Sequence, residues 1–538
     1  MSYRFPAAVL FLAFCITLSD LMAQTVEVQW GAMIKESRHS EVLDVVGSDT
    51  TGYYVVKGPR SDNPDGVKNN YYTGEYLKES VNTGIVHLDQ DMKPVKETII
   101  EGEELKLDHL ATFKVRDRVY TFSSHLDQKK HFRRVYVQTI DRSGLLLGQD
   151  LQQVAEIEDT RTVLDSEVDF AFSRDSSFIL VYTNVQGRKK DPDRFAMHVF
   201  DAKMTPLWSK DVAVPIRENR FQVADLVLDD FGNVYIVAKH YHSQPKDKVK
   251  GKPGYEYVVY GYRNQGQEKV DYILNLRNHF LSDLHLEVAP NGELICAGFF
   301  SDYGVSTAKG TFYLTVDPST REILQKSLYE FGIDFLTMHL SDGKKARIQK
   351  KAANGKDVGL GKFDIRELIS RPDGGSILVA EQYFVREIGT GYGYNSDPVQ
   401  FKYHYNDIVV VSIDPVGDIE WATKIPKRQV SLDDGGYYSS FAMMMRKGNL
   451  HFIYNDHKLN IEEQRTSNLK NFKLDDDNGI IALATVDPLG KVERKPLFPN
   501  SDLLTICRPK MCSQVNEHEM LIYGRTGNKT QFGKITFN

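Results

Sequence analysis

The sequence predicts an all-β protein, an eight-bladed β-propeller in which every blade is a four-stranded antiparallel sheet. Three observations lead to this prediction. Two short strand-and-turn patterns alternate along the chain, their spacing suits one propeller blade with its loops, and the two chain ends supply complementary parts of one blade. A seven-bladed ring with a separate hairpin is the alternative.

The first pattern is a polar turn followed by an apolar strand. In the clearest copy, residues 229–233 form the turn and residues 234–238 the strand. Gly, Asn and Asp supply the positive φ angles of a tight hairpin. Eight copies occur, with strands that begin near Tyr53, Val119, Phe178, Val234, Leu294, Ile377, Leu450 and Met520.

The second pattern is an apolar strand that ends in a hydrophobic residue and Asp, followed by a turn and another strand. We expect the Asp to accept hydrogen bonds from the turn amides after it. Together the two patterns give strands A, B, C and D, in repeats of mostly 52–73 residues. The pattern occurs at Leu88-Asp89, Ile140-Asp141, Phe200-Asp201, Val316-Asp317, Ile413-Asp414 and Val486-Asp487, with a degenerate copy at 262–264.

The two termini predict how the ring closes. The chain ends at Asn538 after a C strand, so the eighth repeat lacks its D strand. Trp208 and Trp421 each lie in a D strand with an aliphatic residue four positions later, and Trp30 has the same relation to Ile34. Residues 26–34 are therefore predicted to be the missing strand, which removes an open sheet edge.

Two segments resemble the β-propeller repeats called SBBP and, more loosely, NHL-type repeats. They are Asp-Asp-Phe-Gly-Asn-Val-Tyr at 229–235 and Val-Ser-Ile-Asp-Pro-Val-Gly-Asp-Ile-Glu-Trp at 411–421. The resemblance extends over nearly the whole chain after residue 24, although about half of the repeats match well. It implies the fold and no activity, because propellers serve many functions.

Residues 1–24 have the features of a cleavable secretory signal peptide. Arg4 precedes the apolar run 7–18, and small residues near Ala23 suit cleavage. The run is too short to cross a hydrocarbon core, which takes roughly 20 apolar residues, and Phe14 before Cys15 argues against a lipoprotein. We expect a periplasmic or secreted protein that does not span the membrane, with one propeller domain over 25–538.

The composition fits this assignment. The chain has 538 residues, of which 41% are hydrophobic and 26% charged, which excludes disordered, collagen-like, coiled-coil and multi-span membrane classes. A formal net charge of -6 argues against general nucleic-acid binding. An oxidising compartment would permit Cys507 and Cys512 to pair, with two unlinked thiols as the alternative.

Strand order predicts which face of the ring carries function. A–B and C–D turns lie on one face and are short, whereas B–C and D–A connections lie on the other and include every long segment. Long loops gathered on one face indicate a binding surface. The long segments are 58–80, 184–194, 240–256, 381–405, 456–477 and the D–A insertion 328–363.

The loops contain tyrosines that suit recognition of protein or glycan, because Tyr presents a rigid face and a hydroxyl. The alternative is that they pack beneath the loops. The insertion adds basic residues that could contact an anionic partner, or simply form a solvated helix. The binding candidates are Tyr71, Tyr72, Tyr76, Tyr392, Tyr394, Tyr403, Lys344, Lys345 and Arg347.

Catalytic and metal-binding signals are weak. The sequence contains no G-x-S-x-G and no H-E-x-x-H motif. His240 and His242 would share one face of a strand and could bind Zn with a third ligand, or be ordinary surface histidines. Residues 475–479 resemble a loose Ca loop. No cofactor is predicted.

The function expected from the sequence is therefore non-catalytic. The propeller would bind a protein or glycan of the cell envelope through its loop-rich face, as part of an envelope assembly. The alternative is a carbohydrate-active enzyme with a pair of carboxylates at the mouth of the central channel.

Overall fold

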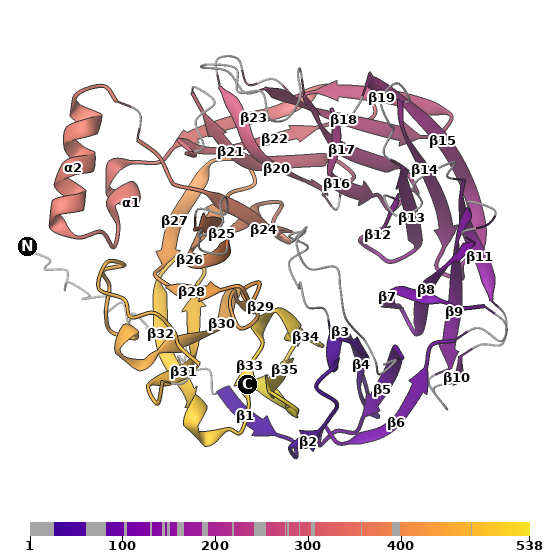
Figure 1. The fold of residues 1–538 in the computed structure, drawn as a ribbon. Helices are drawn as coiled ribbons and strands as arrows, with labels where there is room; N and C mark the ends of the chain where they lie inside the picture. Colours follow the sequence, from indigo (N-terminus) through magenta and orange to yellow (C-terminus); the bar gives the residue numbers. More distant parts are fainter. Residues whose placement is uncertain are drawn as a thin grey trace, which may run out of the picture.

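The computed structural model is an eight-bladed β-propeller, as predicted (Figure 1). It describes residues 26–538 except 61–81, 102–104, 128, 130–131, 142–145, 148–150, 159–165, 186–191, 218–219, 242–253, 275, 277–278, 290, 303–306, 357, 390–398 and 475. In this described part, no helix is long and apolar enough to cross a membrane.

Blades 1 to 4 each contain four or five strands in sequence order from the centre outward. Blade 1 comprises β3 (Ser40–Asp49), β4 (Gly52–Pro59), β5 (Gly84–Leu88) and β6 (Pro94–Ile99). Blade 2 comprises β7 (Asp108–Val115), β8 (Arg118–Asp127), β9 (Phe132–Asp141), β10 (Leu146–Leu147) and β11 (Gln152–Glu158). Blade 3 comprises β12 (Ser166–Phe172), β13 (Phe178–Val185), β14 (Pro192–Asp201) and β15 (Pro206–Arg217). Blade 4 comprises β16 (Phe221–Leu228), β17 (Val234–Tyr241), β18 (Tyr255–Arg263) and β19 (Glu268–Ile273).

Blades 5 to 8 complete the ring. Blade 5 comprises β20 (Phe280–Val288), β21 (Leu294–Ser301), β22 (Gly310–Val316) and β23 (Ile323–Glu330). Blade 6 comprises β24 (Phe363–Ser370), β25 (Ser376–Ile388), β26 (Gln400–Ile413), β27 (Ile419–Ile425) and β28 (Gln429–Leu432). Blade 7 comprises β29 (Ala442–Arg446), β30 (Asn449–His457), β31 (Gly479–Val486) and β32 (Val492–Pro499). Blade 8 comprises β33 (Ile506–Cys507), β34 (Ser513–Gln514), β35 (Glu519–Thr526), β36 (Lys529–Phe537), β1 (Val26–Trp30) and β2 (Ile34–Lys35).

The N-terminal segment closes the ring as the outer part of blade 8. β1 pairs antiparallel with β36 from Val26 opposite Phe537 to Trp30 opposite Gly533, and β2 continues the pairing at Ile34 opposite Thr530. The indole of Trp30 lies so close to Gly533 that a Cβ there would be 2.7 Å from the ring. The predicted closure is confirmed, although the strand expected over 26–34 is broken into two pieces.

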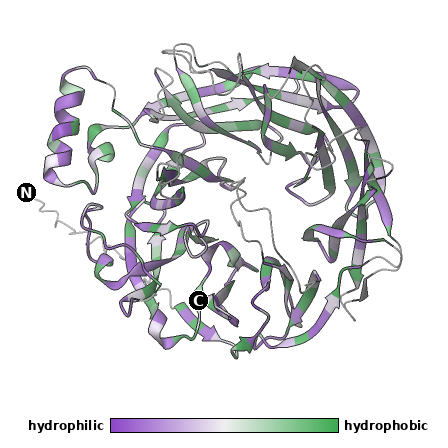
Figure 2. Ribbon diagram, in the orientation of Figure 1, coloured by the Kyte–Doolittle hydropathy of each residue, from purple (hydrophilic) through white to green (hydrophobic). Residues whose placement is uncertain are grey.

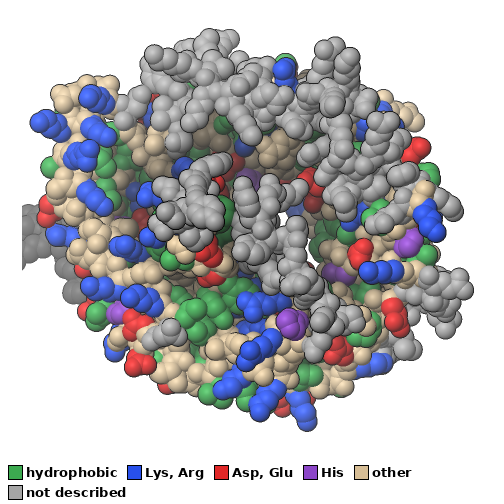
Figure 3. All heavy atoms as spheres, viewed as in Figure 1, with side chains coloured by type: hydrophobic (Ala, Val, Ile, Leu, Met, Phe, Trp, Pro, Cys, Tyr) green, Lys and Arg blue, Asp and Glu red, His purple; other side chains and the backbone are tan. Residues whose placement is uncertain are grey.

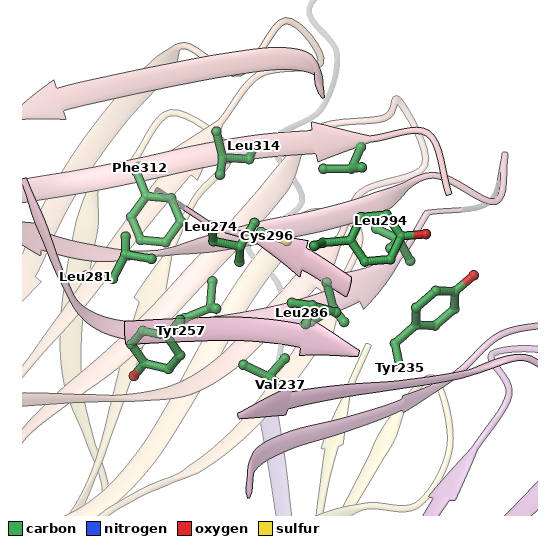
Figure 4. Packing of buried hydrophobic residues seen from close by; sticks show 14 of the residues in the cluster. Tyr235, Val237, Tyr257, Leu274, Leu281, Leu286, Leu294, Cys296, Phe312 and Leu314 are labelled. Carbon is green, nitrogen blue, oxygen red and sulfur yellow. The ribbon is translucent and has the colours of Figure 1, made fainter. Parts of the chain in front are cut away.

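The core lies between the blades. Each blade buries the faces of its central strands against the next blade, and these strands are the most hydrophobic parts of the ribbon (Figure 2). Between blades 4 and 5, residues of β17 and β18 meet residues of β20, β21 and β22 (Figure 4). Each fully buried side chain of the Leu or Phe class contributes about 1.5–3 kcal/mol, so the interfaces between blades supply most of the folding free energy.

The recurring geometry of the C–D turns follows from the Asp that ends most C strands. The Asp487 carboxylate accepts hydrogen bonds from Leu489 N and Lys491 N, both at 2.9 Å, which holds the turn closed. Asp89 and Asp201 make the same two contacts. Asp317 accepts from Ser319 N and Thr320 N, and Asp414 accepts from Asp418 N, so these acids also bind amides of the turn after them, as predicted. At the end of the Asp487 turn Gly490 has φ 80° beneath the ring of Trp421, where a Cβ would be 2.6 Å from the indole.

Among the described residues, the longest connection is the D–A segment 331–362 between β23 and β24. It forms α1 (Ile333–Thr337) and α2 (Asp342–Ala353), which project from the outer rim beside blade 6 (Figure 1). The described connections also contain the 3₁₀ turns η2 (Lys458–Asn460), η3 (Asn500–Asp502) and η4 (Pro509–Met511). The predicted loops 58–80, 184–194 and 240–256 lie largely outside the described residues.

One predicted loop is largely β-structure. The segment expected as a loop over 381–405 extends β25 to Ile388 and begins β26 at Gln400, so the described part of the loop is short. The paired ends of β25 and β26, over Tyr383–Ile388 and Gln400–Tyr405, are called the arm below. The arm is stabilised by β28, which pairs with Lys402–Tyr405. The arm is rich in polar and aromatic residues and has little apolar alternation, so the sequence did not indicate a strand there. It forms a strand because pairing with neighbouring strands outweighs this weak local preference.

Candidate functional site

A pocket of about 620 Å³ opens near the inner strands of blades 6 to 8. Its walls come from β24, the arm of β25 and β26, the start of β29, and the η4–β34 segment of blade 8. In the space-filling view, hydrophobic and cationic side chains adjoin one another over the region of β28–β30 (Figure 3). The lining residues are Arg366, Glu367, Tyr383, Tyr405, Ser440, Phe441, Ala442, Met443, Pro509, Lys510, Cys512, Ser513 and Gln514.

Two tyrosines and two cations form one wall of this pocket. The rings of Tyr383 and Tyr405 lie 4.7 Å apart at a 41° tilt. The Arg366 guanidinium carbon lies 5.4 Å from the centre of the Tyr383 ring, and Lys510 Nζ lies 4.5 Å from the centre of the Tyr405 ring. Lys510 Nζ also donates to the Tyr405 hydroxyl at 2.8 Å. These contacts fix both cations against aromatic surfaces.

A buried ion pair supports the wall from behind. Glu381 and Lys427 are fully buried and pair at 2.7 Å between Oε1 and Nζ. The other carboxylate oxygen of Glu381 accepts from Arg366 at 3.0 Å and from the Ser440 hydroxyl at 2.8 Å. Because every charge here has a partner of opposite sign, Arg366 is held in one orientation at the pocket surface.

The polar network continues across blade 7 into blade 8. Gln429 accepts from Lys427 Nζ at 2.8 Å and donates to the carbonyl of Asn455 at 2.8 Å. Asn455 donates in turn to the carbonyls of Tyr438 and Cys507, each at 2.8 Å. The interior behind the pocket is therefore a chain of hydrogen bonds rather than an apolar core.

The D–A segment 433–441 shapes the edge of the pocket through unusual backbone angles. Gly435 and Gly436 have φ of 63° and 66°, and Ser440, which lines the pocket, has φ 75°. Ser440 is kept in this left-handed conformation by hydrogen bonds from its N to Gln429 and from its hydroxyl to Glu381. A non-glycine residue held in this region in a pocket wall is a feature typical of functional sites.

The η4 turn, which carries Lys510, is attached to blade 1 and to the same segment. Arg508 donates to the Glu41 carboxylate at 2.8 Å, and its guanidinium lies 3.6 Å from the centre of the Tyr437 ring. The Tyr437 hydroxyl also donates to Glu41, at 2.9 Å. Lys510 is thus positioned by contacts that span the closure of the ring.

Cys507 and Cys512 bracket this turn. Their sulfurs lie 3.6 Å apart without a disulfide, and Cys512 lines the pocket. The distance shows that the two residues are close enough in space to pair, as the sequence spacing predicted. Cys296 is a buried residue of the interface between blades 4 and 5.

Carboxylates on the inner strands have a structural role. Asp225 on β16 accepts from Leu286 N of blade 5 at 3.2 Å and lies 3.4 Å from His285 Nδ1. Asp283 on β20 accepts from Ile365 N of blade 6 at 3.1 Å. Burial raises the pKa of Asp225. These acids join neighbouring inner strands around the channel.

The predicted tyrosine candidates are not brought together at this pocket. Tyr71, Tyr72, Tyr76, Tyr392 and Tyr394 lie outside the described residues. Tyr403 is 3% exposed on β26 and does not line the pocket. Tyr405, two positions later, is also buried, at 2% exposed, but its side chain forms part of the pocket wall.

The basic candidates of the insertion lie on α2. Lys344, Lys345 and Arg347 belong to a helix with no buried residue, and the blue side chains in Figure 3 show it as a cationic projection. The helix is largely hydrophilic in Figure 2. It therefore stands apart from the pocket.

The histidine pair predicted as a metal site is described only in part. His240 Nε2 lies 2.8 Å from the Tyr260 hydroxyl, and its ring packs near Phe221 and Tyr260. His242 lies outside the described residues. No group of three His, Cys, Asp or Glu side chains in the described ranges is arranged to hold a metal ion.

Several pocket residues were missed by the sequence reasoning. Arg366, Lys510 and Ser440 come from three segments distant in the chain, and no local motif connects them. The segment Asp-Asp-Gly-Gly-Tyr-Tyr at 433–438 could have indicated this part of the pocket. Its two adjacent glycines indicate a turn with positive φ angles beside aromatic residues. That segment packs against the pocket.

Comparison with known proteins shows no family. No protein-family model and no curated protein matches the chain, so its resemblance to SBBP and NHL repeats stays a sequence prediction. The chain is similar to the WD40 domain of SCAP from fission yeast (9% identity, TM-score 0.40, 96% of this chain and 94% of that chain). It is also similar to the polysaccharide lyase Uly1 (8%, 0.38, 95% and 99%) and to a protein of unknown function from Bacteroides caccae (12%, 0.27, 64% and 90%).

Proposed function

We propose that this protein is an exported, non-catalytic propeller that binds an acidic glycan of the cell envelope in the pocket between blades 6 and 8. The observation that carries the proposal is a wall in which the partly exposed ring of Tyr383, backed by the buried Tyr405, lies beside Arg366 and Lys510. Aromatic rings suit the apolar faces of sugar rings, and an Arg and a Lys suit their carboxylate or sulfate groups.

The size and rigidity of the pocket support this proposal. A volume of about 620 Å³ lies in the range of small-ligand sites and would admit a short stretch of sugar units. Arg366 is held by Glu381, and Lys510 is held by the Tyr405 hydroxyl, before any ligand binds. A preformed site of this kind binds without a large ordering cost. Export is proposed from the signal-peptide features of residues 1–24.

The number of carboxylates favours binding over hydrolysis. An acid/base glycosidase requires two carboxyl groups on either side of the scissile bond. Among the described residues that line the pocket, Glu367 is the one carboxylate, and burial raises its pKa. A carbohydrate-active enzyme remains the second candidate, because a protonated Glu367 could donate a proton to a leaving group.

A titration calorimetry experiment tests the proposal. The purified protein is titrated with polygalacturonate and with dextran of the same length as a neutral comparison. We expect binding of the acidic polymer alone, weakened at least tenfold by Lys510→Met and by Tyr383→Ala, because each variant removes one half of the wall. Lys344→Met on α2 is the matched control and should bind like the parent protein.

The same samples separate the two candidate functions. Chain length is followed by viscosity and by the appearance of new reducing ends. An unchanged polymer supports the binding protein, whereas shortening that Glu367→Gln abolishes would establish the enzyme instead. Equal affinity for the acidic and neutral polymers, or unweakened binding by Lys510→Met, would overturn the acidic-glycan proposal.

A further inference from the structure

A second cavity, of about 490 Å³, lies on the outer rim between blades 6 and 7. Its walls are the outer strands β27 and β32, the segment 461–464 of the B–C loop of blade 7, and the residues between α1 and α2. It shares no lining residue with the pocket described above. The helical insertion therefore covers this cavity.

The insertion is held over the cavity by backbone contacts. Thr466 N donates to the carbonyl of His339 at 2.7 Å, and His339 Nε2 lies 3.3 Å from the carbonyl of Lys424. His339 has φ 64°, a left-handed conformation that a non-glycine residue adopts at a cost. Arg465 pairs with Asp342 of α2 at 3.2 Å. The covering segment is thus bound on both sides.

Two cations line the cavity without forming an ion pair in the described structure: Asp407 acts on Lys424, and Asp456 on Arg494, only through space. Lys424 is 5% exposed; its Nζ donates to the carbonyl of Phe335 at 2.7 Å and lies 4.6 Å from the centre of the Phe335 ring. Arg494 donates to the carbonyls of Pro426 and Glu463 at 3.2 and 2.7 Å. Within the described part of the chain, neither side chain forms an ion pair.

This arrangement is unusual for a buried charge. A lysine taken out of water is costly unless an opposite charge compensates it. Asp407 is the carboxylate that acts on Lys424 through space, but its hydrogen bonds go to Lys427 N and the Thr466 hydroxyl. Burial lowers the pKa of Lys424 to about 8, so an anion in the cavity would restore its full charge.

We propose that this cavity is a binding site for an oxyanion group, such as phosphate, sulfate or carboxylate, held by Lys424 and Arg494. The guanidinium supplies a planar pair of donors and the ammonium supplies donors beyond the one given to Phe335. Glu462 and Glu493 also line the cavity but are exposed, so they stand at its rim. Their negative charges partly offset the attraction of the two cations for an anion.

The neighbouring helix α2 favours anion capture. Between Asp342 and Ala353 it carries Lys344, Lys345, Arg347, Lys350 and Lys351 against one acid. These exposed charges attract anions over distances of about a Debye length. The basic helix therefore attracts anions to this side of the ring. The binding site itself is the cavity and not the helix.

The test measures thermal unfolding of the full chain in low-millimolar phosphate, sulfate or acetate, against sodium chloride of the same ionic strength. At these concentrations general salt stabilisation is small. Specific binding to the folded state raises Tm with anion concentration. We expect a rise with at least one anion in the parent protein, and the preferred anion distinguishes a tetrahedral group from a carboxylate.

Variants assign the effect to the cavity. Lys424→Met and Arg494→Gln should each weaken the anion response at least tenfold in concentration, even though Lys424→Met is expected to be no less stable without anion. Lys510→Met in the other pocket should respond like the parent protein, which separates this site from the acidic-glycan proposal. No anion response, a response retained by both cavity variants, or one lost in the α2 variant Lys344→Met with Arg347→Met would overturn the proposal.

Discussion

Asp456 is an acidic residue at the end of β30 that is completely buried. One carboxylate oxygen accepts from His457 N at 2.8 Å and from Asn460 Nδ2 at 2.6 Å, while the other, Oδ2, has no hydrogen-bond partner in the described structure. Burial raises its pKa to about 6. These hydrogen bonds hold the start of the B–C loop of blade 7. They require a carboxylate that is poorly solvated when it is charged, which lowers the stability of the folded state.

The pH dependence of stability follows from this shift. The folded-state pKa lies above the ordinary value of 3.8, so near pH 5 the folded chain binds a proton that the unfolded chain does not. The contribution of Asp456 is therefore most favourable below pH 4 and is lost as pH rises to about 6. Asp456→Asn should remove this dependence and stabilise the protein at pH 7 by up to about 3 kcal/mol.

Urea unfolding of the parent and Asp456→Asn at a series of pH values between about 4 and 7.5 measures this effect. Asp477→Asn, in the same loop but exposed, is the matched control and should follow the parent curve. A variant that is less stable than the parent at pH 7 would show that the charged carboxylate is needed by its partners.

At the scale of the element, the turn between the C and D strands shows how one residue fixes a local structure. Asp487 Oδ1 accepts from two amides of the turn; Asp89 and Asp201 repeat this geometry, and Asp317 and Asp414 also accept from amides of the turns that follow them. This regularity explains why the turn pattern could be recognised from the sequence.

Asp487→Ala should lower the free energy of unfolding by about 1–2 kcal/mol, because two amides lose their acceptor. Asp487→Asn keeps an oxygen at the same position and should lose much less. Chemical denaturation of the two variants side by side gives the difference. Equal stabilities for Ala and Asn would mean that the turn is held by its backbone alone.

At the scale of the whole molecule, stability depends on a contact between residues at opposite ends of the chain. β1 and β2 provide the outer edge of blade 8, and Trp30 packs edge-on against Phe498 of blade 7 with ring centres 5.2 Å apart. Without this segment β36 would expose an unpaired edge.

Deletion of residues 26–35 should therefore lower stability by roughly 3–5 kcal/mol and promote aggregation. Calorimetry gives the change in Tm and light scattering follows association. Trp30→Ala, which keeps the strand, should have a smaller effect, and a synthetic peptide of residues 26–35 should restore part of the loss. An unchanged Tm in the deletion would contradict closure by this strand.

The fold was predictable because its determinants are local and repeated. Turn residues such as Asp487 and Gly490 recur in most repeats, and the three Trp residues marked equivalent outer strands. The site was less predictable. Tyr403 and Tyr405 have the same residue type and are both buried, at 3% and 2% exposed, yet Tyr405 lines the pocket and Tyr403 does not.

The sequence by itself determined the number of blades, the order of the strands and the closing segment. Each of these depends on hydrogen-bond geometry and apolar alternation within a few residues. Only the tertiary structure decided which side chains meet. Arg366, Lys510 and Lys424 obtain their surroundings from other blades, and electrostatic interactions depend on distance and burial, which neighbours in sequence do not specify.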